Sequence, residues 1–137
     1  MKKLENFSKN LALLKTIDPY LADNSPIYRM GVITQFNRTF EFAWKALQEK
    51  MKLHAVEGAE TGTPTEILKL GNKAGFLSDS TVWQNMLKKA TIPVDSYDTE
   101  SIEETIPLIL NSFIPAFSEL EKTLEVKCKK ADFLDNV

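Results

Sequence analysis

The chain has 137 residues, of which 43% are hydrophobic and 26% charged, and its formal net charge is −2. This length allows one domain with an apolar core that needs neither disulfides nor metal, and the composition excludes a disordered or fibrous protein. The slight acidity, with a pI near 5.5, argues against the broad basic surface of proteins that bind nucleic acid non-specifically.

Apolar residues recur at helical spacing nearly throughout, and no convincing alternating run predicts a strand. A first helix is expected over residues 3–17, ending near Pro19 because the residue before a proline avoids the α region. A second helix is expected over 26–54, preceded by a capping segment at 23–26. Phe42 lies off the apolar stripe of this helix, so it is either an isolated exposed aromatic residue or a subunit contact.

Three further helices follow. A short one is expected over 64–74 and a fourth after a cap at 78–79. The fifth, over 99–127, has apolar residues in steps of three and four, which is typical of a bundle seam. Pro107 and Pro115 fall inside it and are expected to kink it.

Short connections between long amphipathic helices predict an all-α fold, an antiparallel up-and-down helical bundle of about four main helices plus a short side helix. Residues 1–137 are interpreted as one domain, in which 128–137 form a frayed or docking tail.

Several catalytic and targeting signals are absent from the sequence. His54 is the single histidine and is interpreted as a helix-end residue, so His-based metal sites and hydrolase triads lack their parts. The glycines are spaced wrongly for a phosphate-binding loop, and no Asp-x-Asp pair is present to hold magnesium. We therefore predict no catalytic residue, no metal and no cofactor. The single cysteine, Cys128, and the lack of a signal peptide or membrane span predict a cytoplasmic protein.

The second predicted helix carries a charged pattern. Glu41 precedes Lys45 by four residues and follows Arg38 by three, so these side chains can form a charged ladder on one helix face. An ordinary solvated face explains the same pattern. Lys89, at the end of the fourth helix, is favoured there by the helix dipole.

Several segments share an order and spacing that point to a known family. They are GVITQFNRTFEFAWKAL (31–47), PTEILKLGNKAGFLSD (64–79), VWQNMLKK (82–89) and SYDTESIEETIPLIL (96–110). Together they resemble the nucleotidyltransferase substrate-binding protein family, a branch of the HEPN superfamily, over about residues 3–125. The resemblance implies a helical bundle, usually a homodimer, that works beside a separately encoded minimal nucleotidyltransferase carrying the magnesium-binding carboxylates.

The resemblance also implies a degenerate ribonuclease motif. Several family members belong to toxin–antitoxin modules in which the HEPN subunit is a metal-independent ribonuclease, silenced when its partner attaches AMP to a tyrosine. The arginine, histidine and tyrosine of that motif fall at Lys89, Asp95 and Tyr97. An ionised aspartate repels an RNA phosphate, and lysine lacks the planar fork of arginine. We therefore expect hydrolysis through this motif to be negligible.

The leading hypothesis is a non-catalytic subunit that dimerises and binds a minimal nucleotidyltransferase through a groove between the second helix and the 88–98 turn. The residues expected to bind substrate or the phosphates of a nucleotide or RNA are Arg38, Glu41, Lys45 and Lys89. Tyr97 is the candidate for adenylylation, although it could equally pack its ring at the mouth of the bundle. Two alternatives are a ribonuclease toxin with an altered motif and a helical adaptor without a ligand.

Overall fold

In the computed structural model, residues 2–92 and 99–135 are described, with side chains for 2–92 and 100–126. Helices are the only regular elements in these ranges, which confirms the all-α prediction. Their bounds are α1 Lys2–Leu14, α2 Pro19–Asn24, α3 Pro26–Leu53, α4 Pro64–Lys73, α5 Ser80–Ala90, α6 Thr99–Leu108, the π-helix η2 Ile109–Phe113 and α7 Ile114–Asp135. None of these helices has the length and hydrophobicity that crossing a membrane requires.

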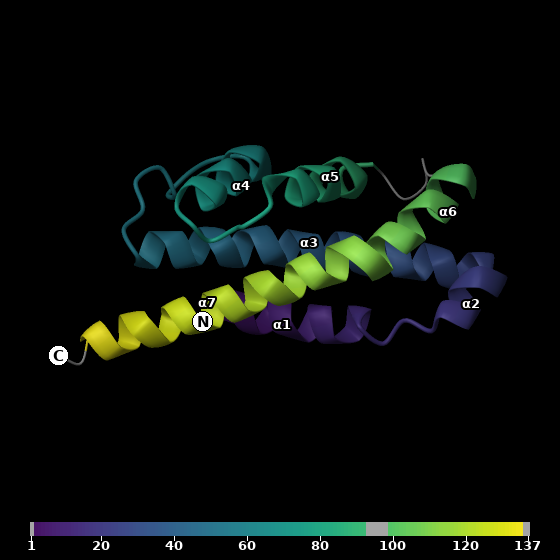
Figure 1. The fold of residues 1–137 in the computed structure, drawn as a ribbon, viewed down its shortest axis with the longest axis horizontal. Coiled ribbons are helices and arrows are strands. Elements are labelled where there is room, and N and C mark those ends of the chain that lie inside the picture. The colour runs from purple at the N-terminus through teal and green to yellow at the C-terminus, as the bar shows by residue number, and fades with distance from the viewer. Residues whose placement is uncertain (1, 93–98, 136–137) are drawn as a thin grey trace.

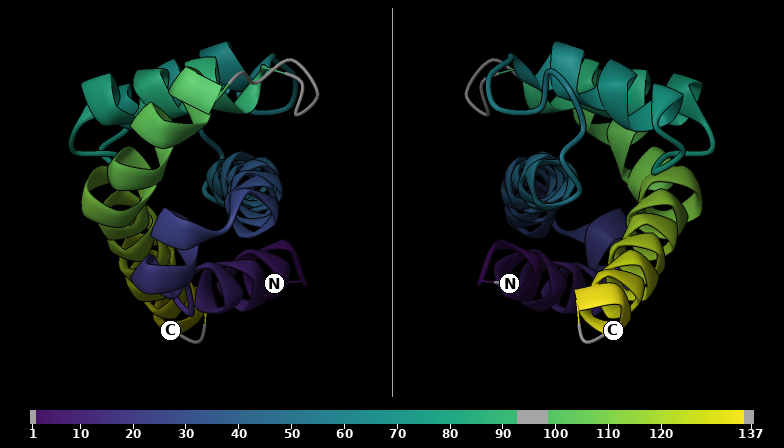
Figure 2. Two further views of the ribbon diagram at one scale, coloured as in Figure 1. Left: turned by 90° about the vertical axis from the view of Figure 1, so that its right-hand side faces the viewer. Right: turned by 90° about the vertical axis from the view of Figure 1, so that its left-hand side faces the viewer.

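The helices form an antiparallel up-and-down bundle. α1, α3, the α4–α5 pair and the long α6–η2–α7 helix run in alternating directions along one axis (Figure 1). Viewed along this axis, α1, α3 and α7 lie around a common centre, and α4 with α5 covers one side of it (Figure 2). The predicted architecture is therefore confirmed, with α4 as the short side element.

Side-chain caps explain where the helices begin. The Ser25 hydroxyl accepts a hydrogen bond from the Tyr28 N–H at the start of α3, as the capping segment predicted. The short helix α2 was not predicted. The Asp18 side chain accepts from the Tyr20 N–H, and Pro19 occupies the first helical turn, so the residues interpreted only as a stop also start a helix.

The core is built around aromatic rings. Phe36 of α3 stacks on Phe113 of η2, with ring centroids 5.2 Å apart. Trp83 of α5 lies 6.4 Å from Phe40 and 5.6 Å from Phe117, between α3 and α7. All five rings are buried, which fixes how the C-terminal helix packs against α3.

A buried polar contact joins α1 to α3. The Gln35 side-chain amide donates to the Asn10 carbonyl at 3.1 Å and to its side-chain oxygen at 3.0 Å. Thr39, one turn further along α3, is fully buried and also donates to the Asn10 carbonyl. These bonds satisfy polar groups inside the α1–α3 interface and so fix its register.

The long C-terminal helix changes its winding ahead of a proline. Residues 109–113 form a π-helix, and Pro115 follows it by two positions. A proline ring clashes with the carbonyl four residues earlier and donates no hydrogen bond, so a wider turn relieves the conflict. α6, which contains Pro107, points away from the direction of α7 (Figure 1). The expected kink is confirmed.

The structure shows where two residues that were singled out in the sequence, His54 and Phe42, lie in the fold. His54 is the C-cap of α3, as its interpretation as a helix-end residue required. Phe42 is half-buried and packs against the core, so it is not an isolated exposed aromatic residue.

Candidate functional site

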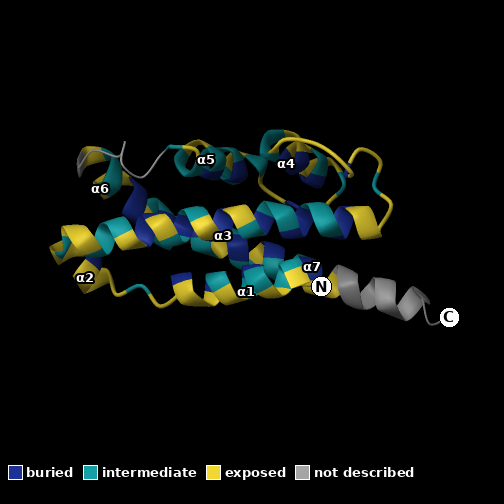
Figure 3. Ribbon diagram, turned by 180° about the vertical axis from the view of Figure 1, so that it is seen from behind, coloured by how far each residue is buried: buried dark blue, intermediate teal, exposed yellow. Residues whose placement is uncertain are grey.

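α3 presents an exposed face along the back of the bundle. Figure 3 shows exposed positions recurring along this helix. Its buried residues, such as Ile33, Phe36 and Phe40, lie on the opposite side of the helix. The exposed positions include Ile27, Thr34, Arg38, Glu41 and Lys52. Their spacing is that of one helical face, which the packing of α1, α4, α5 and α7 on the other side leaves open to solvent.

Glu41, Trp44 and Lys45 form a compact group on this face, here called the Glu41 cluster. The Lys45 Nζ lies 2.9 Å from Glu41 Oε1, and the Trp44 indole N–H donates to Glu41 Oε2 at 3.2 Å. Lys45 Nζ is also 5.9 Å from the centroid of the Trp44 ring. Both carboxylate oxygens are therefore engaged. The paired side chains are 42% and 53% exposed, so the pair contributes only about 0.3–0.5 kcal/mol.

Arg38 does not complete the predicted three-residue ladder. Among the described residues, the ion pairs of the structure join Lys45 to Glu41 and Lys3 to Glu49, and neither includes Arg38. Arg38 is exposed one turn before Glu41. The structure therefore confirms a charged pair and leaves the guanidinium available to a ligand.

Lys89 lies at a distance from the Glu41 cluster because of the direction in which α5 runs along α3. Trp83 packs beside Phe40, and α5 runs opposite to α3, so Lys89 lies towards the N-terminal half of α3 (Figure 1). Lys45 lies towards the C-terminal half. At about 1.5 Å per residue, the two lysines are on the order of 15 Å apart along the bundle axis. Lys89 is half-buried.

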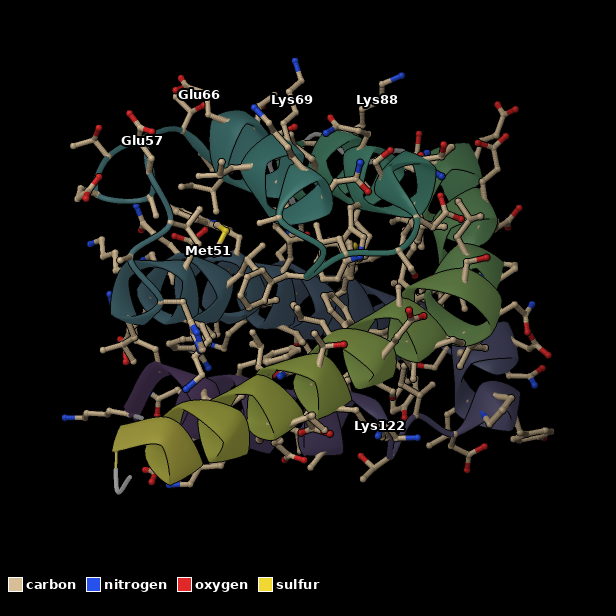
Figure 4. The ribbon with its side chains drawn as sticks, turned by 60° about the vertical axis from the view of Figure 1, so that its left-hand side comes forward. Met51, Glu57, Glu66, Lys69, Lys88 and Lys122 are labelled. Atoms are coloured by element: carbon tan, nitrogen blue, oxygen red, sulfur yellow. The ribbon has the colours of Figure 1, made fainter. Side chains whose placement is uncertain are left out.

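The other residues of the degenerate motif cannot be placed in the fold. Asp95 and Tyr97 lie outside the described residues, as does most of the 88–98 turn. Lys88, beside Lys89, points outward from α5 and away from α3 (Figure 4). The structure thus places α5 and its last turn but not the predicted groove.

Asn37 is a candidate that the sequence interpretation did not include. Its side-chain oxygen is buried and has no hydrogen-bond partner in the part of the chain that the structure describes. Asn37 precedes Glu41 by four residues and Trp44 by seven, so all three lie along one strip of α3. Buried polar atoms are usually paired, which makes this oxygen a candidate contact for a ligand or partner. In the sequence, the four-residue spacing between Asn37 and Glu41 was the feature that could have shown that the two side chains share one face of the helix.

An apolar groove lies between the end of α1 and the start of α3. It has a volume of about 400 Å³ and is lined by neutral residues, including Ile17, Tyr28 and Gly31. Ile27 and Leu13, on its edges, are 86% and 58% exposed. Large apolar side chains gathered at a groove indicate a protein contact surface.

Among the side chains that the structure describes, no group of three or more His, Cys, Asp or Glu is arranged to hold a metal ion.

A family model described as "Nucleotidyltransferase substrate binding protein like" matches residues 2–126, which span α1 to α6, η2 and the described side chains of α7. The resemblance inferred from the sequence segments is thereby confirmed. A comparison with curated proteins found no match.

Proposed function

Because the chain belongs to the nucleotidyltransferase substrate binding protein like family, we propose that it is a non-catalytic, HEPN-like subunit that binds a separately encoded minimal nucleotidyltransferase. It would serve that enzyme as a substrate-binding or adenylylated partner, in a module of the toxin–antitoxin type. Family membership is the observation that carries the proposal. The exposed face of α3, with its charged residues, supports it as a surface available to a partner.

The proposal divides the chemistry between two chains. Nucleotidyl transfer uses magnesium held by closely spaced carboxylates, and this sequence has no Asp-x-Asp pair, so the partner would supply the metal site. The Tyr97 phenol oxygen would then attack the α-phosphorus of ATP. A new oxygen–phosphorus bond forms, pyrophosphate leaves with the broken bond, and the phenol proton passes to a base of the partner or to water.

Phosphate recognition is proposed for the cations of α3 and α5. Arg38 is the strongest candidate because it is exposed, has no ion-pair partner among the described residues, and offers a planar fork to phosphate oxygens. Lys45 is weaker because Glu41 already pairs with its ammonium group. Lys89 would contact a different part of the ligand, since it lies further along the bundle.

Dimerisation is proposed through the groove between α1 and α3, with a second copy of the chain as its occupant. The same patch contains both a projecting side chain, Ile27, and a recess, so two copies related by a two-fold axis can each insert into the other. The Gly31 position supports this assignment, because a Cβ built there meets no described atom within 4 Å other than the nearby backbone of α3, so the helix is open to close approach.

Co-expression with a nucleotidyltransferase encoded by an adjacent reading frame tests the proposal. We expect the two chains to co-purify, and the intact mass of this chain to rise by one AMP when ATP and magnesium are added. Tyr97→Phe should remove that mass gain without preventing co-purification. Two chains that remain separate at micromolar concentrations would overturn the proposal. Purified chain that cleaves RNA, and loses this activity on Asp95→Ala or Lys89→Ala, would instead support the ribonuclease alternative.

A further inference from the structure

A cavity of about 170 Å³ lies between the start of α5 and the η2–α7 segment, and no residue of α3 lines it among those that the structure describes. Its walls include the buried side chains of Trp83 and Leu120. The polar residues that line it are Ser78, Asp79, Ser112 and Glu119. It is separate from every residue assigned to nucleotide or partner binding above.

Hydrogen-bonding groups on this cavity have no partner in the described part of the chain. Trp83 is only 3% exposed as a residue, and its indole N–H donates to no acceptor among the described residues. The indole nitrogen is not among the fully buried atoms, so it can still reach a molecule in the cavity. The Ser112 hydroxyl is also unpaired among these residues. In the same long helix, Thr105 and Thr123 donate to carbonyls four residues earlier, at 2.7 and 3.0 Å. Ser112 lies in the π-helix, a kind of turn often found at functional sites.

The charges on the cavity favour a cation. The Ser78 hydroxyl donates to one oxygen of Glu119, and the other oxygen has no partner among the described residues. Asp79 is committed to capping α5, where it accepts from the N–H groups of Thr81 and Val82. Among the described residues, no lysine, arginine or histidine lines the cavity.

We propose that this cavity binds a small organic amine that also carries a hydroxyl group. The ammonium would donate to the free oxygen of Glu119, and the ligand hydroxyl oxygen would accept from the Trp83 N–H. The cavity is open to solvent on the side of Ser78, Asp79 and Glu119, which are exposed, and its volume of about 170 Å³ limits the ligand body that its apolar walls can contact to about one ring. The proposal goes beyond the proposed function, because it requires neither a nucleotidyltransferase nor Tyr97.

A ligand series with one shared body tests the charge preference. The probes are 2-amino-1-phenylethanol, 1-phenyl-1,2-ethanediol and mandelate, which share a ring and a hydroxyl but end in an ammonium, a neutral hydroxyl and a carboxylate. Binding to the full chain is measured by calorimetry, and by tryptophan fluorescence in a Trp44→Phe variant that leaves Trp83 as the single tryptophan. We expect the amine to bind about tenfold more tightly than the diol, because it gains a charge-assisted hydrogen bond, and mandelate to bind most weakly. No binding of the amine at millimolar concentration, or equal binding of all three probes, would overturn the proposal.

Matched variants assign the site within the chain. Glu119→Gln keeps the size of the side chain and should abolish the preference for the amine over the diol. Glu125→Gln, on an exposed residue of α7 outside the cavity, should leave that preference intact. Trp83→Phe should weaken the amine and the diol by similar factors, since both use the hydroxyl contact. A preference that survives Glu119→Gln in folded protein, as judged by circular dichroism, would contradict the assignment. These measurements use the chain alone, so their failure leaves the proposed partnership untouched.

Discussion

Gly71 of α4 lies directly against Leu47 of α3: a Cβ atom built on Gly71 would stand 2.8 Å from Leu47 Cδ2. Leu47 is fully buried, so it cannot move aside without disturbing the core. The missing side chain is therefore what allows α4 to approach α3 so closely.

Gly71→Ala should accordingly be less stable than Gly31→Ala, by about 1–3 kcal/mol in the free energy of unfolding. Both substitutions gain similar helix propensity, but a Cβ at Gly31 meets no described atom within 4 Å apart from the nearby backbone of its own helix. Urea unfolding at concentrations where light scattering shows a monomer measures the difference. Equal stabilities of the two variants would show that Leu47 adjusts without cost.

The contact at Gly71 also shows which parts of the fold the sequence could predict. The starts of α3, α4 and α5 were predictable because Ser25, Thr63 and Asp79 cap the residues that immediately follow them. The approach of α4 to α3 was not, because it depends on two helices separated by a loop. α2 was missed for a local reason, since an Asp–Pro pair can end one helix and begin another.

The same distinction applies to the candidate site. The Glu41–Lys45 pair was predictable because residues four apart on a helix are neighbours. The separation of Lys89 from this pair depends on the direction in which α5 crosses α3, which no local pattern encodes. The cavity at Trp83 was missed because its other wall, including Glu119, comes from a helix more than thirty residues later in the chain.

Ser25→Ala should lower the free energy of unfolding by about 1 kcal/mol. The Ser25 hydroxyl accepts from the Tyr28 N–H at 3.2 Å, and alanine leaves this N–H without its side-chain partner. Ser25→Asp should retain most of the stability, because a carboxylate can cap the helix. Thr34→Ala, at an exposed position inside α3, serves as the control and should change stability by less than about 0.5 kcal/mol. Thermal or urea unfolding separates these outcomes, and a loss for Ser25→Asp as large as that for Ser25→Ala would argue against the cap.

Ile27→Asp should convert the proposed dimer into a monomer. Ile27 is 86% exposed beside the groove between α1 and α3, and a charge inserted into the partner's apolar recess would lose its hydration. Leu53→Asp is the matched control, because Leu53 is 63% exposed at the other end of the same helix. Light scattering coupled to size exclusion measures both masses. A dimer that survives Ile27→Asp but dissociates on Leu53→Asp would place the interface elsewhere on α3.

Arg38→Gln should weaken ATP binding by the complex of this chain and its nucleotidyltransferase by about tenfold, as expected for losing a hydrogen-bonded charge contact. Lys45→Gln should have a smaller effect, since the Lys45 ammonium is already 2.9 Å from Glu41 Oε1. Lys69→Gln is the control, because Lys69 points outward from α4 (Figure 4). Calorimetric titration of the complex with ATP gives the affinities.

Glu41→Gln provides an independent check on this order, because it removes the carboxylate that neutralises Lys45. If the two side chains compete as their geometry indicates, the variant should bind ATP more tightly than the unchanged chain, and Lys45→Gln should then cost more in the Glu41→Gln background. The increase should shrink as salt is added, since the released charge is exposed to solvent. Weaker ATP binding by Glu41→Gln would mean that the Glu41 cluster acts as a unit. In that case the Glu41 carboxylate would hold the Lys45 ammonium in position for ATP, rather than compete with ATP for it.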